Sequence, residues 1–255
     1  MFKIAKYVVY DILRSKVLIA YSLFLLLVSF SLFSMEENSS KSLISLMSVV
    51  MIIVPLVSII FSTTYFYNAY QFIELLVAQP ISRSSILMGE FLGVSVSLLT
   101  ALLLGVGIPV LIYAPDATGF VLMISGFALT LSFISLAFFS SVAMRDKAKG
   151  IGMSLMLWFY FSVIYDGLVL GILFSFNEYP LEKAVIALAS FNPIDLGRII
   201  ILMKMDISAL MGLTGAVYKQ FFGSSFGIIY SLSIMLIWIT APLLIALRIF
   251  KRKNL

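Results

Sequence analysis

The chain has 255 residues, of which 62% are hydrophobic and only 11% charged, and its mean hydropathy is +1.14. Soluble domains are about 45–50% apolar and about 25% charged, so a soluble enzyme, a coiled coil and a disordered chain are all excluded. Alternating ten-residue strands are missing, which excludes an outer-membrane barrel. The chain also lacks Cys and His, which removes disulfides, thiol nucleophiles, imidazole bases and the usual zinc ligands. The sequence predicts an all-α polytopic membrane protein.

Six apolar windows are long enough to cross about 30 Å of hydrocarbon at about 1.5 Å per residue. Five of them contain no Lys, Arg, Asp or Glu, and the fifth in chain order contains one ionisable residue, Asp166. The windows cover residues 17–35, 42–73, 91–115, 117–144, 151–176 and 220–247. We therefore predict six transmembrane helices.

The basic residues predict the orientation, because Lys and Arg are retained in cytoplasmic loops. With six spans both termini lie on one side of the membrane. That side holds twelve of the seventeen basic residues and four acidic ones, whereas the other side holds five basic and seven acidic residues. We expect both termini in the cytoplasm. Since the bases flank the spans, as topology signals do, no nucleic-acid partner is expected.

Residues 1–16 place aromatic and aliphatic side chains among four basic ones. This pattern is typical of an amphipathic helix lying at the inner membrane interface. A positively charged flank without a helix of its own is the alternative, because so short a segment gives a weak periodicity.

The connection between the second and third spans is the longest predicted cytoplasmic loop. A helix is expected over residues 71–77 and ends at Gln79 and Pro80, because the residue before a proline is disfavoured in the α conformation. The run Ser82, Arg83, Ser84 and Ser85 supplies candidate N-caps for the third span, which we expect to rise from about Ile86.

The same short helix is expected to carry Phe72, Leu75 and Leu76 on one side. An apolar face that points into the cytoplasm needs a partner.

Two features inside the spans are informative. Gly105 and Gly107 precede Pro109, which predicts a kink and a close helix contact in the third span. Asp166 would cost about 2.5–3.5 kcal/mol at the centre of a span, so it should face a pathway or a dimer interface. The alternative is that a shifted span boundary leaves Asp166 hydrated.

The segment 177–223 is the longest piece outside the predicted spans. Its apolar runs, 184–191, 196–203 and 207–218, are too short to cross the membrane and fit interfacial or re-entrant helices on the outer side. Asn192, Pro193 and Asp195 form a helix-start signature, with Asn as the cap. Asp206 repeats this signal for the third run.

The sequence lacks several motifs, and their absence limits the reactions that the chain can catalyse. The chain has no GxxxxGK[ST] phosphate loop, so it is not expected to hydrolyse ATP itself. A secondary transporter usually shows mid-membrane ionisable residues in two related halves, and here Asp166 is the single candidate. An intramembrane enzyme would need an acid–base pair or a metal cluster. We expect no catalytic residue, no metal site and no cofactor in this chain.

The loop at residues 71–93, QFIELLVAQPISRSSILMGEFLG, resembles that of the type-2 ABC transporter permeases, the ABC-2 family. In these a Glu-Leu-Leu segment followed by Gln-Pro and Ser-Arg precedes the third span. The resemblance implies one transmembrane domain over residues 1–255, a second permease copy, and a separate ATPase subunit that binds ATP and Mg. The residues implied to lie in or beside a coupling helix at 71–83, where the ATPase binds, are Glu74, Leu75, Gln79, Pro80 and Arg83.

Residues 191–224 are similar to the outer segment of the NosY-type permeases linked to nitrous oxide reductase maturation. That likeness implies an inner-membrane permease with a NosF-like ATPase and a periplasmic NosD-like partner. The residues it places in an outer docking region are Asn192, Pro193, Asp195 and Asp206. A sulfur or copper species would be moved, or ATPase motion transmitted to the outer partner, although the absence of His and Cys departs from a copper carrier. The alternatives are a non-transporting membrane scaffold and an exporter of another substrate.

Overall fold

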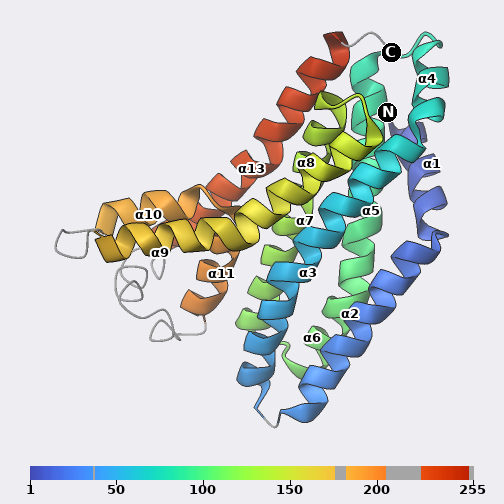
Figure 1. Ribbon diagram of the computed structural model, residues 1–255. Helices are drawn as coiled ribbons and strands as arrows, with labels where there is room; N and C mark the ends of the chain where they lie inside the picture. The colour runs from blue at the N-terminus through green and yellow to red at the C-terminus, as the bar shows by residue number, and fades with distance from the viewer. Residues whose placement is uncertain (37, 176–181, 205–224, 253–255) are drawn as a thin grey trace.

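A computed structural model describes residues 1–36, 38–175, 182–204 and 225–252 (Figure 1). Within these ranges all regular elements are helices, and six helical segments are long and apolar enough to cross a membrane. They cover Lys16–Met35, Ser39–Asn68, Arg83–Tyr113, Ala117–Ala143, Lys147–Ile172 and Ile229–Arg252. The predicted helical class and the six spans are confirmed. The second span ends at Asn68, and the last residues of the window 42–73 belong to a separate short helix.

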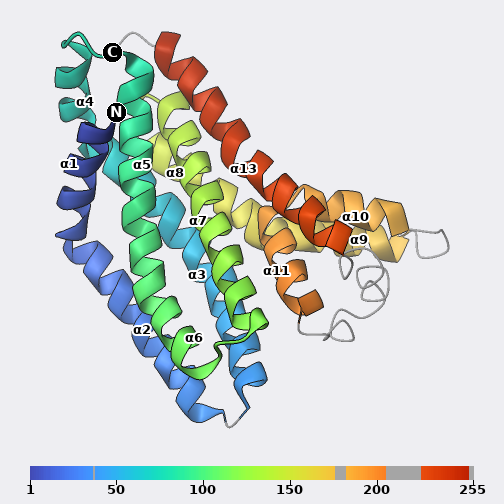
Figure 2. The same cartoon turned by 180° about the vertical axis from the view of Figure 1, so that it is seen from behind.

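Both termini lie at one end of the bundle, which we call the terminal end, and the α2–α3 and α6–α7 turns lie at the other, the far end (Figures 1 and 2). In chain order the helices are α1 (Phe2–Leu13), α2 (Lys16–Met35), α3 (Ser39–Asn68), α4 (Tyr70–Val77), α5 (Arg83–Leu102), the π-helix η1 (Leu103–Gly107), α6 (Ile108–Tyr113), α7 (Ala117–Ala143), α8 (Lys147–Phe159), the π-helix η2 (Tyr160–Ile164), α9 (Tyr165–Ser175), α10 (Glu182–Ser190), α11 (Pro193–Lys204) and α13 (Ser225–Arg252).

Helix α7 is the central element and packs against α3, α13 and α11. In its most apolar stretch 67% of residues are buried, against 11% in the segment Lys147–Ile172. Four of its hydroxyl groups bond back to its own backbone, as Thr130 does to the Gly126 carbonyl at 2.8 Å. Small and hydroxylated residues of this kind let membrane helices approach closely.

The segment from α8 to α11 departs from the bundle. Helices α9 and α10 lean away from α7 at mid-height (Figures 1 and 2). Helix α11 returns into the bundle, where Gly197 lies against Leu129 of α7 and Met51 of α3. Both partners are near the middle of their helices, so α11 packs at mid-depth in the bundle. Two of the three predicted short helices are thus confirmed, and the run 207–218 lies outside the described residues.

The third span bends at the predicted glycines. Residues Leu103–Gly107 form the π-helix η1, and Pro109 follows in α6. A proline has no N–H and cannot continue the regular ladder, so a wider turn accommodates it. A Cβ atom on Gly105 would lie 2.6 Å from the Cβ of Leu25, which confirms the expected close contact with another helix, α2.

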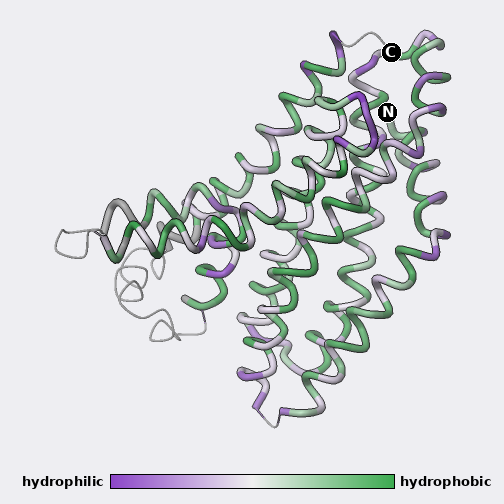
Figure 3. The backbone as a smooth tube through the Cα atoms, in the orientation of Figure 1, coloured by the Kyte–Doolittle hydropathy of each residue, from purple (hydrophilic) through white to green (hydrophobic). Residues whose placement is uncertain are grey.

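Helix α1 is amphipathic as predicted, and its apolar side faces α5. Ile4, Val8 and Ile12 are buried. The approach is close because α5 presents glycines: a Cβ on Gly89 would lie 2.9 Å from the Cβ of Ile4, and one on Gly93 would overlap the Val8 side chain. Polar residues follow the expected distribution and gather at the helix ends and turns (Figure 3).

This contact predicts the effect of a single methyl group. Gly93→Ala should displace α1 and lower stability by about 1–3 kcal/mol, the range for overpacking. The matched control is Gly152→Ala in α8, where a Cβ would meet nothing within 4 Å. The thermal unfolding midpoint of the detergent-solubilised protein should fall for Gly93→Ala. It should be unchanged or higher for Gly152→Ala. Equal midpoints would contradict the contact.

Candidate functional site

The first candidate site is the coupling segment, which we define as α4 and the turn that follows it, residues 70–83. One side of α4 packs on the chain itself: Ile73 and Leu76 are buried, and the Phe72 ring stacks on Tyr7 of α1 at a centroid distance of 5.0 Å. The other side carries Glu74 and Leu75, and Leu75 is 67% exposed. The helix therefore presents a narrow free surface at the terminal end.

Of the three apolar residues predicted on one side of α4, Phe72 and Leu76 pack on the chain itself, whereas Leu75 is exposed. The burial of Ile73 and the stacking of Phe72 on Tyr7 show which side of the helix faces the protein. Leu75 lies at the edge of that side, next to the exposed Glu74. The unpartnered surface is thus one leucine beside a carboxylate and not a continuous apolar stripe.

The turn after α4 behaves as the sequence predicts. The Ser82 hydroxyl accepts a hydrogen bond from the Ser85 N–H at 3.3 Å and caps α5, which begins at Arg83 and not at Ile86. Gln79 and Pro80 are exposed.

Arg83 is half-buried and donates to the carbonyl oxygen of Lys251 in α13 at 3.4 Å. The structure thus brings the five predicted coupling residues to the terminal end. Four of them are exposed, and Arg83 is hydrogen-bonded to α13. Their role in binding an ATPase stays a prediction.

The second candidate site is a charged cluster where α9 meets α11. Arg198 Nη1 lies 3.1 Å from Asp166 Oδ2 and 3.4 Å from Asp195 Oδ1. Asp166, a predicted pathway or interface residue, therefore has a partner within the same chain. Burial and the nearby Asp166 carboxylate raise the pKa of Asp195 to about 7, and Arg198 opposes this shift. Sequence reasoning missed Arg198, although its spacing of three from Asp195 on one helix is a usable signal.

Asn192 and Pro193 have a structural place beside this cluster. The Asn192 side-chain oxygen accepts from the Ile194 N–H at 3.0 Å, which confirms the predicted cap. Its amide donates to the carbonyl oxygen of Phe161 in η2 at 2.9 Å. Both Asn192 and Pro193 are buried, so a docked protein would meet their neighbours first. The docking role stays a prediction, and Asp206 lies outside the described residues.

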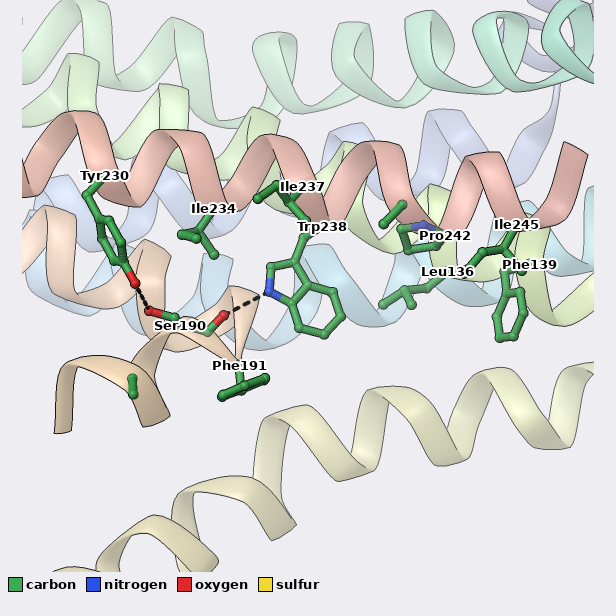
Figure 4. A pocket seen from close by; sticks show the side chains of 12 residues that line it. Leu136, Phe139, Ser190, Phe191, Tyr230, Ile234, Ile237, Trp238, Pro242 and Ile245 are labelled. Carbon is green, nitrogen blue, oxygen red and sulfur yellow. Dashed lines mark hydrogen bonds between the residues drawn. The ribbon is translucent and has the colours of Figure 1, made fainter. Parts of the chain in front are cut away.

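A cavity of about 600 Å³ lies between α7, α10 and α13 (Figure 4). Its walls are almost wholly apolar, and its polar atoms bond to one another. The Ser190 and Tyr230 hydroxyls are 2.8 Å apart, and the Trp238 indole N–H donates to the Ser190 carbonyl at 3.1 Å. The lining contains no carboxylate, sulfur or imidazole, so it offers a metal ion no ligand set. The part of the chain that the structure describes also holds no group of three potential metal-binding His, Cys, Asp or Glu residues.

The charged cluster predicts a pH dependence. Because the folded-state pKa of Asp195 is raised from 3.8 to about 7, the folded protein binds a proton more tightly than the unfolded chain, and stability falls as pH rises between these values. The unfolding midpoint should therefore drop between pH 5 and pH 8 by less in Asp195→Asn than in the wild type. Glu36→Gln, an exposed carboxyl at the far end, is the control and should follow the wild type. Identical slopes for wild type and Asp195→Asn would contradict the assignment.

Comparison with known proteins gives one family. A model described as "ABC-2 family transporter protein" matches residues 2–255. The chain is 29% identical over 201 residues to "Probable ABC transporter permease protein NosY" of Stutzerimonas stutzeri, covering 70% of this chain and 67% of that protein. It is 31% identical over 148 residues to the protein of the same name from Pseudomonas aeruginosa, where the match spans 54% of each chain, or about half of that relative's length. With six membrane-crossing helices and a family match along nearly its whole length, the chain belongs to the ABC-2 family of transporter membrane subunits.

Proposed function

We propose that this chain is the NosY-like permease subunit of an ATP-driven transporter that serves nitrous oxide reductase maturation. A separate NosF-like ATPase, which binds ATP and Mg, docks on the coupling segment. One observation carries the proposal: a short helix at the terminal end exposes Glu74 and Leu75 while its inner side is fixed to the membrane domain. The two relatives named NosY support the choice of system.

The contacts of the coupling segment suggest how motion would spread. Helix α4 is joined to α5 by a short turn, its Phe72 stacks on α1, and Arg83 reaches the last turn of α13. When the ATPase subunits close on ATP, a push on α4 is delivered to α1, α5 and α13 together. Helix α13 lines the apolar cavity with α7 and α10, so the push changes that cavity.

The orientation belongs to the same proposal. The terminal end, which carries most of the basic residues, faces the cytoplasm, and the protein spans the inner membrane. A second permease copy covers part of the segment Lys147–Ile172, in whose most apolar stretch only 11% of the residues are buried in one chain. Met156 in this segment is 77% exposed and Leu170 is 55% exposed.

The cargo is a sulfur or copper species, or none, in which case the subunit transmits ATPase motion to a periplasmic NosD-like protein. The chemistry of the cavity favours transmission over copper carriage, because its lining contains no sulfur or carboxylate ligand. A non-transporting scaffold or an exporter of another substrate is the alternative. ATP hydrolysis that accelerates when a candidate substrate is added to the reconstituted complex would argue against the scaffold.

Charge reversal tests the docking surface. In cells that also express the NosF-like ATPase, Glu74→Arg in the full chain should reduce the co-purified ATPase at least tenfold, because it places a cation in the narrow exposed surface. Glu36→Arg makes the same change at an exposed far-end position and should leave ATPase recovery unchanged. Deletion of residues 71–83 should abolish recovery. Wild-type recovery with both coupling-segment variants would overturn the proposal.

A further inference from the structure

A groove of about 770 Å³ lies at the junction of α1 and α2, against the second half of α3. Its size falls within the range of small-molecule and lipid sites, about 300–1,000 Å³. The wall changes character along α3: Leu56 and Ile60 are apolar, whereas Thr64, Tyr65 and Asn68, nearer the terminal end, are polar. From Leu56 to Asn68 the helix rises by about 18 Å at about 1.5 Å per residue. A gradient of this kind, from the membrane interior to the interface, matches an amphiphile and not a water-soluble ligand.

The polar half of the groove carries charges of both signs. Asp11 and Arg14 of the α1 end line it, and the Tyr65 hydroxyl donates to Asp11 Oδ2 at 3.4 Å. Asp11 has no ion pair with any of the described residues. Arg14 lies over the Tyr10 ring at 3.9 Å. Lys147 donates to the side-chain oxygen of Asn68 at 2.8 Å and adds a second cation at the rim.

A further carboxylate lies behind Tyr65. Glu90 of α5 is 1% exposed, and neither of its oxygens has a hydrogen-bond partner in the described structure. It interacts electrostatically with Tyr65 and with Asp11. Asp11 is exposed in the groove and Glu90 is buried nearby, so the polar half favours a bound group that is cationic and donates hydrogen bonds to a carboxylate.

We propose that the groove binds a membrane phospholipid with a primary-amine headgroup, of the phosphatidylethanolamine type. The ammonium group binds Asp11 next to Tyr65, the phosphate lies between Arg14 and Lys147, and an acyl chain follows Val17, Leu56 and Ile60. A phospholipid without the amine would leave Asp11 unpaired, and a trimethylated headgroup cannot donate hydrogen bonds to it. The proposal depends on these charges and not on the transported substrate or the ATPase.

The test uses the full-length protein, stripped of lipid in detergent, and three phospholipids with the same acyl chains: ethanolamine, choline and glycerol forms. Native mass determination should show the ethanolamine form retained at least fivefold more than the other two. Asp11→Asn should remove this preference, and Glu90→Gln should weaken it. Arg14→Gln should reduce retention of all three forms alike, because each carries the same phosphate. Glu36→Gln is the matched control and should retain the wild-type preference.

Three outcomes would overturn the proposal. One is equal retention of the three lipids by the wild type, and another is an ethanolamine preference that survives Asp11→Asn. The third is that the groove is covered by a second permease copy. In that case Leu56→Trp would weaken dimerisation, and no lipid would depend on Asp11. If the proposal is right, Leu56→Trp fills the apolar half, lowers lipid retention and leaves the oligomeric state unchanged.

Discussion

The close approach of α1 to α5 is the contact on which the terminal end depends. Gly89 and Gly93 leave no side chain between the two helices, so Ile4 and Val8 lie against the α5 backbone. This position brings Tyr7 to the Phe72 ring of α4 and Asp11 to the Tyr65 hydroxyl of α3. The coupling segment and the lipid groove therefore share one support. Under the two proposals, a push on α4 and a lipid bound beside α1 would act on the same helix.

The segment from α8 to α11 is held by polar contacts, in contrast to the close apolar packing of α1 on α5. In a bilayer each backbone polar group must be satisfied within the protein, and the π-turn η2 disturbs the regular ladder beside Phe161. The Asn192 amide binds the carbonyl of that residue and caps α11 with its oxygen. Arg198 then pairs with both Asp166 and Asp195 across the same junction. Few residues in the most apolar stretch of the segment Lys147–Ile172 are buried, so these polar contacts fix the place where η2 and α9 meet α11.

The sequence was sufficient for the features that depend on local chemistry. Hydropathy predicted the six spans, Pro80 and Ser82 marked the end of one helix and the start of the next, and Gly105 predicted a close contact. Contacts between distant segments were not predictable from it. The burial of Asn192 depends on a carbonyl 31 residues earlier. The exposure of Leu75 was not predictable, because the side of α4 that packs on the protein is fixed by a contact with Tyr7, which is distant in the sequence.

The central claim is that the exposed side of α4 contacts a separate ATPase, and the absence of cysteine from the chain makes a direct measurement practical. A single Leu75→Cys variant is expressed with the candidate ATPase and treated with a short thiol-to-amine cross-linker in intact membranes. Mass spectrometry then identifies the cross-linked chain. We predict an adduct between residue 75 and the ATPase, and none from Glu36→Cys at the far end. A contrary result would be an ATPase that co-purifies with the Leu75→Cys chain and yet forms no adduct with it, or one that reacts equally with residue 36.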